Sequence, residues 1–173
     1  MADEVYFITF TIFGWKNIFV KDKYCQLVFK WFDYLQNEYG NKIHGYVIMS
    51  NHIHILLFIS RKSPKLPILI LNAKRFLSYG IRNLLKTDNE ADLLNFFAEN
   101  KTKSKSNYKF FEPRYDSLLI QTEKFFLEKL NYIHNNPCQE KWSLSDKPED
   151  YIYSSALNYI TGKGLYEIEV VDF

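Results

Sequence analysis

Length, composition and charge exclude several classes of protein. The chain has 173 residues, enough for one domain with a buried core, and its formal net charge is only +2. Its 2 cysteines make neither a disulfide framework nor a metal cluster, and no apolar run is long enough to span a membrane. The start, Met-Ala-Asp-Glu, does not resemble a signal peptide. We therefore expect a single domain over residues 1–173 of a cytoplasmic protein that has no membrane partner.

Basic residues are unevenly distributed along the chain. Residues 61–86 include seven basic side chains and no acidic one, and a second basic cluster without acids lies within residues 101–109. Such segregation would give a positive surface, as binding of a polyanion requires. Charged stretches are more often ordinary solvated surface, so this pattern alone is weak.

The N-terminal part predicts a strand followed by a helix. Residues 4–13 are rich in β-branched and aromatic residues, which predicts a strand that ends at Gly14. Apolar residues recur at helical spacing over residues 22–39. We expect Asp22 to cap this helix and Gly40 to end it.

A hairpin that carries two histidines is predicted next. Residues 43–49 predict a strand, residues 50–51 a tight turn, and the apolar run after them a third, buried strand. Side chains alternate between faces along a strand, so His52 and His54 share one face, with Cα atoms roughly 6.6 Å apart. Two imidazoles at that spacing can bind one metal ion, although a histidine near an apolar strand is more often an ordinary core or surface residue. His44 could approach the pair, but we expect it at the surface of the strand edge.

The second half of the chain predicts helices at residues 69–85, 122–136 and 154–160. Residues 86–107 are polar around one apolar island and predict a long surface excursion with a short helix. Residues 108–120 predict a bent or edge strand around Pro113, and residues 166–173 an extended end. The resulting order of elements predicts an α+β fold: a ferredoxin-like (RRM-like) antiparallel sheet with helices packed on it.

The predicted helix before Pro137 carries a second pair of chemically useful residues. Tyr132 and Asn136 are four residues apart, so they share one helix face. Asn136 offers an amide oxygen, which suits magnesium or manganese, and Tyr132 offers a phenol that could attack phosphorus. Taken alone, a half-buried tyrosine and a helix C-cap would be the commoner interpretation. Tyr115 is a rival nucleophile, but no metal ligand follows it four residues later.

These motifs together resemble single-tyrosine transposases of the insertion-sequence transposase-like superfamily, whose HUH motif is His, a bulky apolar residue and His. The similarity is greatest to the REP-associated tyrosine transposases. It rests on Tyr-Val-Ile-Met-Ser-Asn-His-Ile-His-Ile-Leu-Leu at residues 46–57, on Tyr-Ile-His-Asn-Asn-Pro at 132–137, and on residues 151–159. The chain departs from the family at Phe111-Glu112, where Trp-Gln is frequent, and residues 86–107 have no counterpart that we can place.

The resemblance implies a ferredoxin-like fold and metal-dependent cleavage and transfer of single-stranded or hairpin DNA, as in DNA transposition. His52, His54 and Asn136 match the ligands of a divalent metal, magnesium or manganese, and Tyr132 matches the nucleophile that forms a covalent 5′-phosphotyrosine. The basic side chains expected to bind DNA phosphates are Arg61, Lys62, Lys74, Arg75, Arg82 and Lys86. The main alternative is a catalytically silent, domesticated DNA-binding module on the same fold. A homodimer is also an open alternative, and a structural zinc protein fits least, because a closed fourth ligand is missing.

Overall fold

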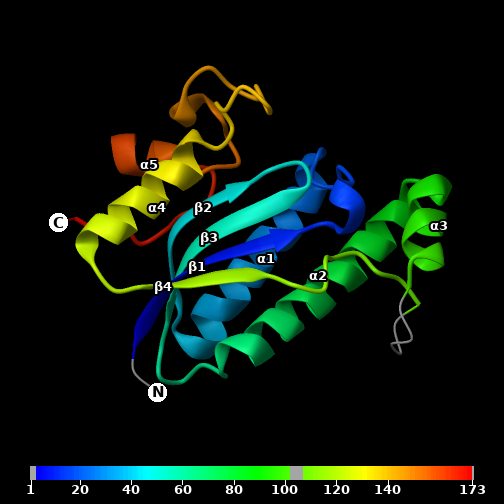
Figure 1. Ribbon diagram of the computed structural model, residues 1–173, viewed down its shortest axis with the longest axis horizontal. Coiled ribbons are helices and arrows are strands. Elements are labelled where there is room, and N and C mark those ends of the chain that lie inside the picture. Colours follow the sequence, from blue (N-terminus) through cyan, green and yellow to red (C-terminus); the bar gives the residue numbers. More distant parts are fainter. Residues whose placement is uncertain (1–2, 102–106, 173) are drawn as a thin grey trace.

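A sheet of four antiparallel strands, in the spatial order β2-β3-β1-β4, forms the centre of the molecule (Figure 1). The structure is a computed structural model that describes residues 3–101 and 107–172. The strands are β1 (Glu4–Thr11), β2 (Lys42–Ile48), β3 (His52–Ile59) and β4 (Asp116–Ile120). This strand order, with helical crossovers after β1 and after β3, is that of a ferredoxin-like sheet. The predicted α+β fold class is confirmed.

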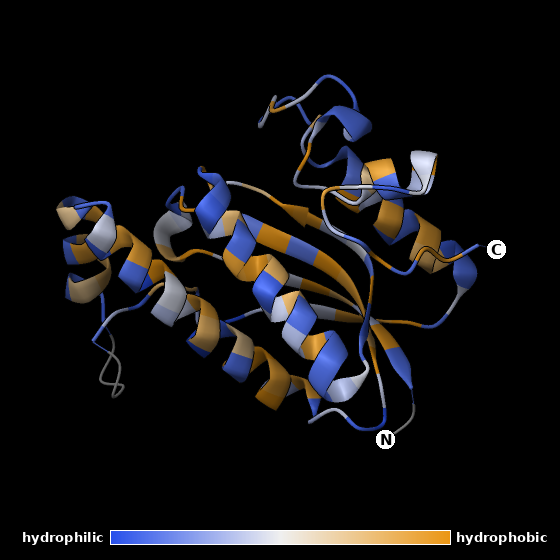
Figure 2. Cartoon of the chain, turned by 180° about the vertical axis from the view of Figure 1, so that it is seen from behind, coloured by the Kyte–Doolittle hydropathy of each residue, from blue (hydrophilic) through white to orange (hydrophobic). Residues whose placement is uncertain are grey.

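Helices cover both faces of this sheet. The helices are α1 (Asp22–Tyr39), α2 (Leu66–Thr87), α3 (Ala91–Glu99), α4 (Glu123–Asn135) and α5 (Ala156–Thr161), with short 3-10 turns η1 (Phe13–Trp15) and η2 (Pro148–Asp150). Figure 1 shows α1 and α2 on one face and α4 on the other. Figure 2 looks onto α1 and α2 and shows polar and apolar residues alternating along both, as amphipathic helices require.

The strands divide their side chains between two cores. On β1, Ile8 and Phe10 point to the face of α1 and α2 and belong to the larger core. Phe7 points the other way and packs with residues of α4 in a smaller core. This alternation follows from the two-residue period of a strand. The face that α4 covers is the one on which His52 and His54 lie, because Ile53 and Ile55 belong to the larger core.

The helices α1 and α2 pack closely against each other. A β-carbon on Gly80 of α2 would lie 2.6 Å from the Leu27 side chain of α1, so a residue without a side chain allows the contact. As predicted, α1 ends at Gly40, whose φ of 68° is left-handed. The predicted cap at Asp22 is wrong: the helix begins at Asp22, and Lys21 occupies the N-cap position without a side-chain bond.

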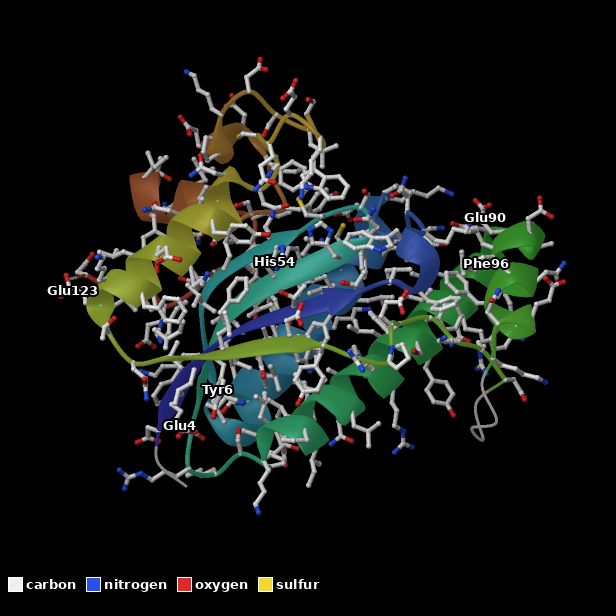
Figure 3. All side chains as sticks on the ribbon, in the orientation of Figure 1. Glu4, Tyr6, His54, Glu90, Phe96 and Glu123 are labelled. Carbon is white, nitrogen blue, oxygen red and sulfur yellow. The ribbon has the colours of Figure 1, made fainter. Side chains whose placement is uncertain are left out.

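Residues 86–107 contribute more to the core than a surface excursion would. The helix α3 buries Phe97 in the larger core and packs Phe96 against Phe13. Figure 3 shows Phe96 pointing from α3 toward the segment after β1. Residues 102–106 of the predicted excursion lie outside the described part of the chain. The predicted strand at 108–120 is too long, because β4 forms only after Pro113, at Asp116.

The helix α4 is capped at its start, and the C-terminal segment after it pairs with β2. Thr122 caps α4 by accepting a hydrogen bond from the backbone N–H of Phe125. The buried Ser155 hydroxyl accepts a hydrogen bond from the backbone N–H of Tyr46, and the backbone N–H of Glu169 donates to the carbonyl of Ile43. No helix among the described residues has the length and apolar character that crossing a membrane requires. A single domain over the whole chain stays a prediction.

Candidate active site

The strand β3 presents His52 and His54 side by side on the face that α4 covers. Their ring centroids are 4.8 Å apart, and both side chains are buried, with 4% and 5% of their surface exposed. Figure 3 shows His54 on the same side of the sheet as α4. The alternation along β3 thus produces the predicted pair.

Each imidazole is bonded through Nδ1 to a neighbouring side chain. His52 Nδ1 lies 2.7 Å from the Asn51 amide oxygen, which can only accept, so Nδ1 of His52 carries the proton. The other half of the Asn51 amide donates to the carbonyl of Trp15 at 3.4 Å, which fixes its orientation. His54 Nδ1 lies 2.8 Å from the Thr9 hydroxyl on β1. These contacts leave the Nε2 atom of each ring for another partner.

Burial lowers the pKa of both imidazoles. For His52 burial lowers the pKa to about 4, with the Asn136 side chain opposing the shift and the charge of Lys141 adding to it. For His54 burial is again the largest cause, followed by His52 and Lys141, and the pKa falls to about 3. Both rings are therefore neutral near pH 7, which is the form that binds metals.

The helix α4 brings Tyr132 and Asn136 to the same place. The Tyr132 ring centroid lies 5.2 Å from that of His54 and 5.9 Å from that of Phe7, and 41% of the residue is exposed. Asn136 is only 1% exposed, and neither polar atom of its amide has a hydrogen bond of ordinary geometry. Its nearness to His52 shows in the pKa of that ring. The structure therefore gathers the four predicted site residues in one place.

Unpartnered buried atoms at this site fit the donor set of a divalent metal. His54 Nε2 and both Asn136 amide atoms are buried without a partner, although buried polar groups normally have one. Imidazole nitrogen and amide oxygen together suit a metal such as manganese or magnesium. Within residues 3–101 and 107–172 no group of three or more His, Cys, Asp or Glu side chains could hold a metal. A metal here would therefore depend on the amide as third ligand.

The basic residues predicted to contact DNA lie away from this site. The helix α2, which carries Lys74, Arg75, Arg82 and Lys86, packs on the opposite face of the sheet. Arg61 and Lys62 lie in the exposed loop before α2. Arg75 and Arg82 line a groove of about 750 Å³ between α2 and residues 107–113, which also presents the rings of Tyr79 and Tyr108.

Three of these basic side chains already have protein partners, among them Arg82, whose guanidinium donates to the Asn83 amide oxygen at 3.2 and 3.4 Å. The Lys74 ammonium donates to the carbonyls of Glu112, Pro113 and Arg114, at 2.7, 3.3 and 3.3 Å, and burial lowers its pKa. Its three donors thus tie α2 to the segment before β4, which favours a structural role. Arg61 forms an ion pair of 3.3 Å with Asp3 at the surface.

Two other residues considered from the sequence lie outside the site. The prediction that His44 lies at the surface is wrong. The side chain is buried between Phe58 and Phe126, and its Nδ1 lies 2.8 Å from the carbonyl oxygen of Glu169. The strand is flanked on this side by the C-terminal segment, which the local pattern did not predict. Tyr115 lies near the Lys74 ammonium, 5.7 Å from its ring centroid, and α2 is on the face opposite the histidines.

Sequence reasoning missed several side chains that touch the site. Thr9 lies opposite His54 in the β1–β3 register, so a strand alignment could have found it. Lys129 precedes Tyr132 by one helix turn, with Nζ 6.0 Å from its ring centroid. Trp15 and Trp142 pack beside His52, at 5.8 and 5.2 Å between ring centroids, and they come from irregular segments with no readable period.

Comparisons with known proteins show a likeness in fold. No protein-family model matches the chain, and no curated protein matches it. A REP-associated tyrosine transposase, solved bound to a REP hairpin, is similar over 100% of this chain and 90% of its own, with 16% identity and a TM-score of 0.66. A protein of Deinococcus radiodurans R1, provisionally assigned as a transposase, is similar over 78% of this chain and 92% of its own, with 15% identity and a TM-score of 0.48. The first of these confirms, at the level of the fold, the resemblance expected from the motifs.

Proposed function

We propose that this chain cleaves single-stranded DNA with the help of a divalent metal and transfers the cut strand through a covalent 5′-phosphotyrosine, as in DNA transposition. The observation that carries the proposal is the packing of the exposed Tyr132 ring against the buried His54, beside an Asn136 amide that has no partner. A phenol, two neutral imidazoles and a free amide oxygen in one place suit phosphoryl transfer better than they suit a closed core. The fold shared with a REP-associated tyrosine transposase supports the proposal.

His52, His54 and Asn136 would hold the metal, which supplies a positive charge that polarises the scissile phosphate. The Tyr132 oxygen attacks phosphorus in line, the new Oη–P bond forms, and the P–O3′ bond breaks. The phenolic proton passes to water, and the leaving 3′-oxygen takes up a proton as a free hydroxyl. A 3′-hydroxyl of another strand can later attack the phosphotyrosine, reform a phosphodiester and release the phenol, so no nucleotide triphosphate is consumed.

The protein whose fold this chain shares was solved with a REP hairpin, and we propose hairpin DNA as the partner here too. The exposed groove with Arg75 and Arg82 would bind phosphates outside the reaction centre. Lys62, Lys86 and Arg61 are further proposed phosphate contacts, whereas Lys74 would first have to leave its three carbonyls. A homodimer stays a prediction.

The test of the proposal is the covalent adduct itself. Wild-type protein is mixed with a hairpin oligonucleotide library that has single-stranded flanks, with manganese or with a chelator, and separated on a denaturing gel. A protein–DNA band should appear only with metal. Tyr132→Phe keeps the ring packing and removes one hydroxyl, so the band should vanish while binding to the same DNA persists.

Tyr115→Phe is the matched control and should still form the adduct, and mass spectrometry of trapped protein should find the nucleotide on Tyr132. A nucleotide on Tyr115, or an adduct formed by Tyr132→Phe, would show that the nucleophile is wrongly assigned. If the protein binds DNA but forms no adduct with any hairpin and any divalent metal, the catalytically silent DNA-binding module is the better explanation.

A further inference from the structure

Two tryptophans from distant parts of the chain stack on each other beside His52. Trp15 belongs to the turn after β1, and Trp142 to the segment after α4. Their ring centroids are 6.4 Å apart with 23° between the planes, and Trp142 is in turn 5.2 Å from the His52 ring. Trp15 also meets His52 edge-on, with 5.8 Å between the ring centroids, so the stacked pair lies directly beside a proposed metal ligand.

The Trp15 ring is held in an exposed position. It is 56% exposed, whereas Trp31, the remaining tryptophan, is 2% exposed in the core. Its backbone φ of 55° is left-handed, which is rare for a bulky residue, and such conformations persist where surrounding contacts impose them. Those contacts are the Asn51 amide on the Trp15 carbonyl and the Glu112 carboxylate, which accepts from the N–H of Gly14 at 3.0 Å.

An exposed cation lies next to this stack. The Lys141 ammonium is 5.1 Å from the centroid of the Trp142 ring, and its charge lowers the pKa of both His52 and His54. Lys141 is exposed and forms no ion pair within the described part of the chain. The Nε1 atom of Trp142 is buried and has no hydrogen-bond partner. The surface thus combines the exposed flat ring of Trp15 with a cation that has no ion-pair partner.

We infer that Trp15, backed by Trp142, is a stacking platform for one unpaired base of the DNA strand next to the scissile phosphate, and that Lys141 binds a phosphate beside that base. This inference rests on the proposed function, because it assumes that single-stranded DNA reaches the histidines. Aromatic rings with neighbouring cations are the usual surface for unpaired bases, because every base has a π-face and carries a phosphate. A base inside a duplex could not use the platform, since neighbouring bases cover both of its faces.

Binding is tested without metal, so that cleavage plays no part. The full chain, in a chelator, is titrated with an eight-nucleotide oligodeoxythymidine and with an abasic oligomer of the same length, at one fixed salt concentration. Tryptophan fluorescence of the wild type is recorded against the constant background of the buried Trp31, and the affinity of every variant is measured by the anisotropy of a fluorescein-labelled oligomer. The oligodeoxythymidine should quench the tryptophan fluorescence. The abasic oligomer should bind about tenfold more weakly and cause little quenching.

Trp15→Ala should weaken thymidine binding about tenfold and leave abasic binding unchanged, whereas Trp15→Phe should keep most of the affinity because a ring remains. Lys141→Ala should weaken the binding of both oligomers, because both carry phosphates. Tyr79→Ala removes an equally exposed ring from the groove at α2 and tests whether the base stacks there instead, whereas Tyr34→Ala, which removes a 49% exposed ring from α1, should change nothing. An unchanged circular dichroism spectrum establishes that each variant is folded.

Equal affinity of wild type and Trp15→Ala for thymidine would overturn the inference, and a loss confined to Tyr79→Ala would move the base to the groove at α2. Both outcomes are independent of the covalent adduct. Quenching that depends on Trp15 in a protein that never forms an adduct would support the platform and refute the proposed function. An adduct formed at the wild-type rate and yield by Trp15→Ala, with unchanged affinity, would refute only the platform.

Discussion

The hydroxyl of Thr9 lies 2.8 Å from Nδ1 of His54, and it is the nearest polar neighbour of that buried ring. If His54 binds metal through Nε2, Nδ1 must carry the proton and the Thr9 hydroxyl must accept the hydrogen bond from Nδ1–H. Thr9→Val keeps the shape and removes the acceptor, so manganese affinity should fall about 10- to 100-fold. Calorimetric titration of the folded protein with manganese measures this change.

Thr11→Val is the control, because Thr11 lies opposite His52 on the same face of β1 and has no such bond to an imidazole. It should bind manganese as wild type does. His54→Ala removes the proposed ligand and should bind manganese more weakly than Thr9→Val. Equal manganese affinity of wild type and Thr9→Val would assign Thr9 a packing role only.

Residue-level features differed in how far the sequence could predict them. The pairing of His52 with His54 needed only the two-residue period of a strand, and that of Tyr132 with Asn136 only the helix period. Asn51 lay in the recognised motif, but its bond to His52 depends on an amide orientation that the carbonyl of Trp15 fixes. Such a hydrogen bond depends on tertiary packing, so the spacing of residues in the sequence does not predict it.

At the scale of elements, α2 combines a buried apolar stripe with an exposed basic edge. Arg75 and Arg82 lie two turns apart on that edge and line the same groove. Replacing both with alanine should weaken binding of hairpin DNA and flatten its salt dependence, because about two fewer counterions are released. The slope of log affinity against log salt concentration, measured by fluorescence anisotropy, tests this.

Lys74→Ala is an informative comparison. Because its ammonium is bonded to three carbonyls, its loss should lower the urea midpoint of unfolding while changing the salt slope less than the double variant does. An unchanged slope in Arg75→Ala with Arg82→Ala would mean that the basic edge of α2 is ordinary solvated surface.

The helices and strands were largely predictable, since the spacing of apolar residues in a long segment indicates whether it is a helix or a strand. Both α1 and the β2–β3 hairpin lie close to the predicted bounds. The predicted strand before α4 was too long because the aromatic residues at 108–111 favour a strand. In the fold these residues pack against α3, and Phe111 forms one isolated bridge with Ile12, the residue after β1. Tertiary contacts overrode local preference there.

At the scale of the whole molecule, burial lowers the pKa of all 4 histidines. The values fall to about 4 for His52 and His134 and to about 3 for His54, against 6.5 for an ordinary histidine. Between pH 6.5 and about 4 the unfolded chain therefore binds protons that the folded chain does not. The free energy of unfolding should be fully retained above pH 6.5 and should fall steadily below it.

Urea unfolding at pH 8, 7, 6 and 5 checks this expectation. The midpoint should be nearly constant from pH 8 to 7 and should decrease from pH 6 to 5. His134→Gln should make the decrease shallower, because one fewer ring is titrated in the unfolded state alone. A midpoint that stays level down to pH 5 would show that the folded protein accepts these protons.

The position of the basic residues of α2 relative to the histidine pair is also a property of the whole molecule, and no local sequence pattern revealed it. The basic stretch and the histidine pair are neighbours in sequence, yet the sheet separates them. Which face each strand turns toward α2 or α4 depends on the pairing of β1 with β3 and β4. That pairing is long-range, so it follows from the fold and not from spacing.

Tyr132 and Asn136 belong to one short rigid body, since α4 ends at Asn135 and Asn136 is its cap. Four residues along a helix rise only about 6 Å, so the proposed nucleophile and the proposed third ligand cannot be adjusted separately. Any tilt of α4 that withdraws the phenol from the sheet also pulls the amide away from the histidines. The reaction centre would then be assembled or dismantled as a unit, and an idle protein would hold neither an aimed nucleophile nor a fully bound metal.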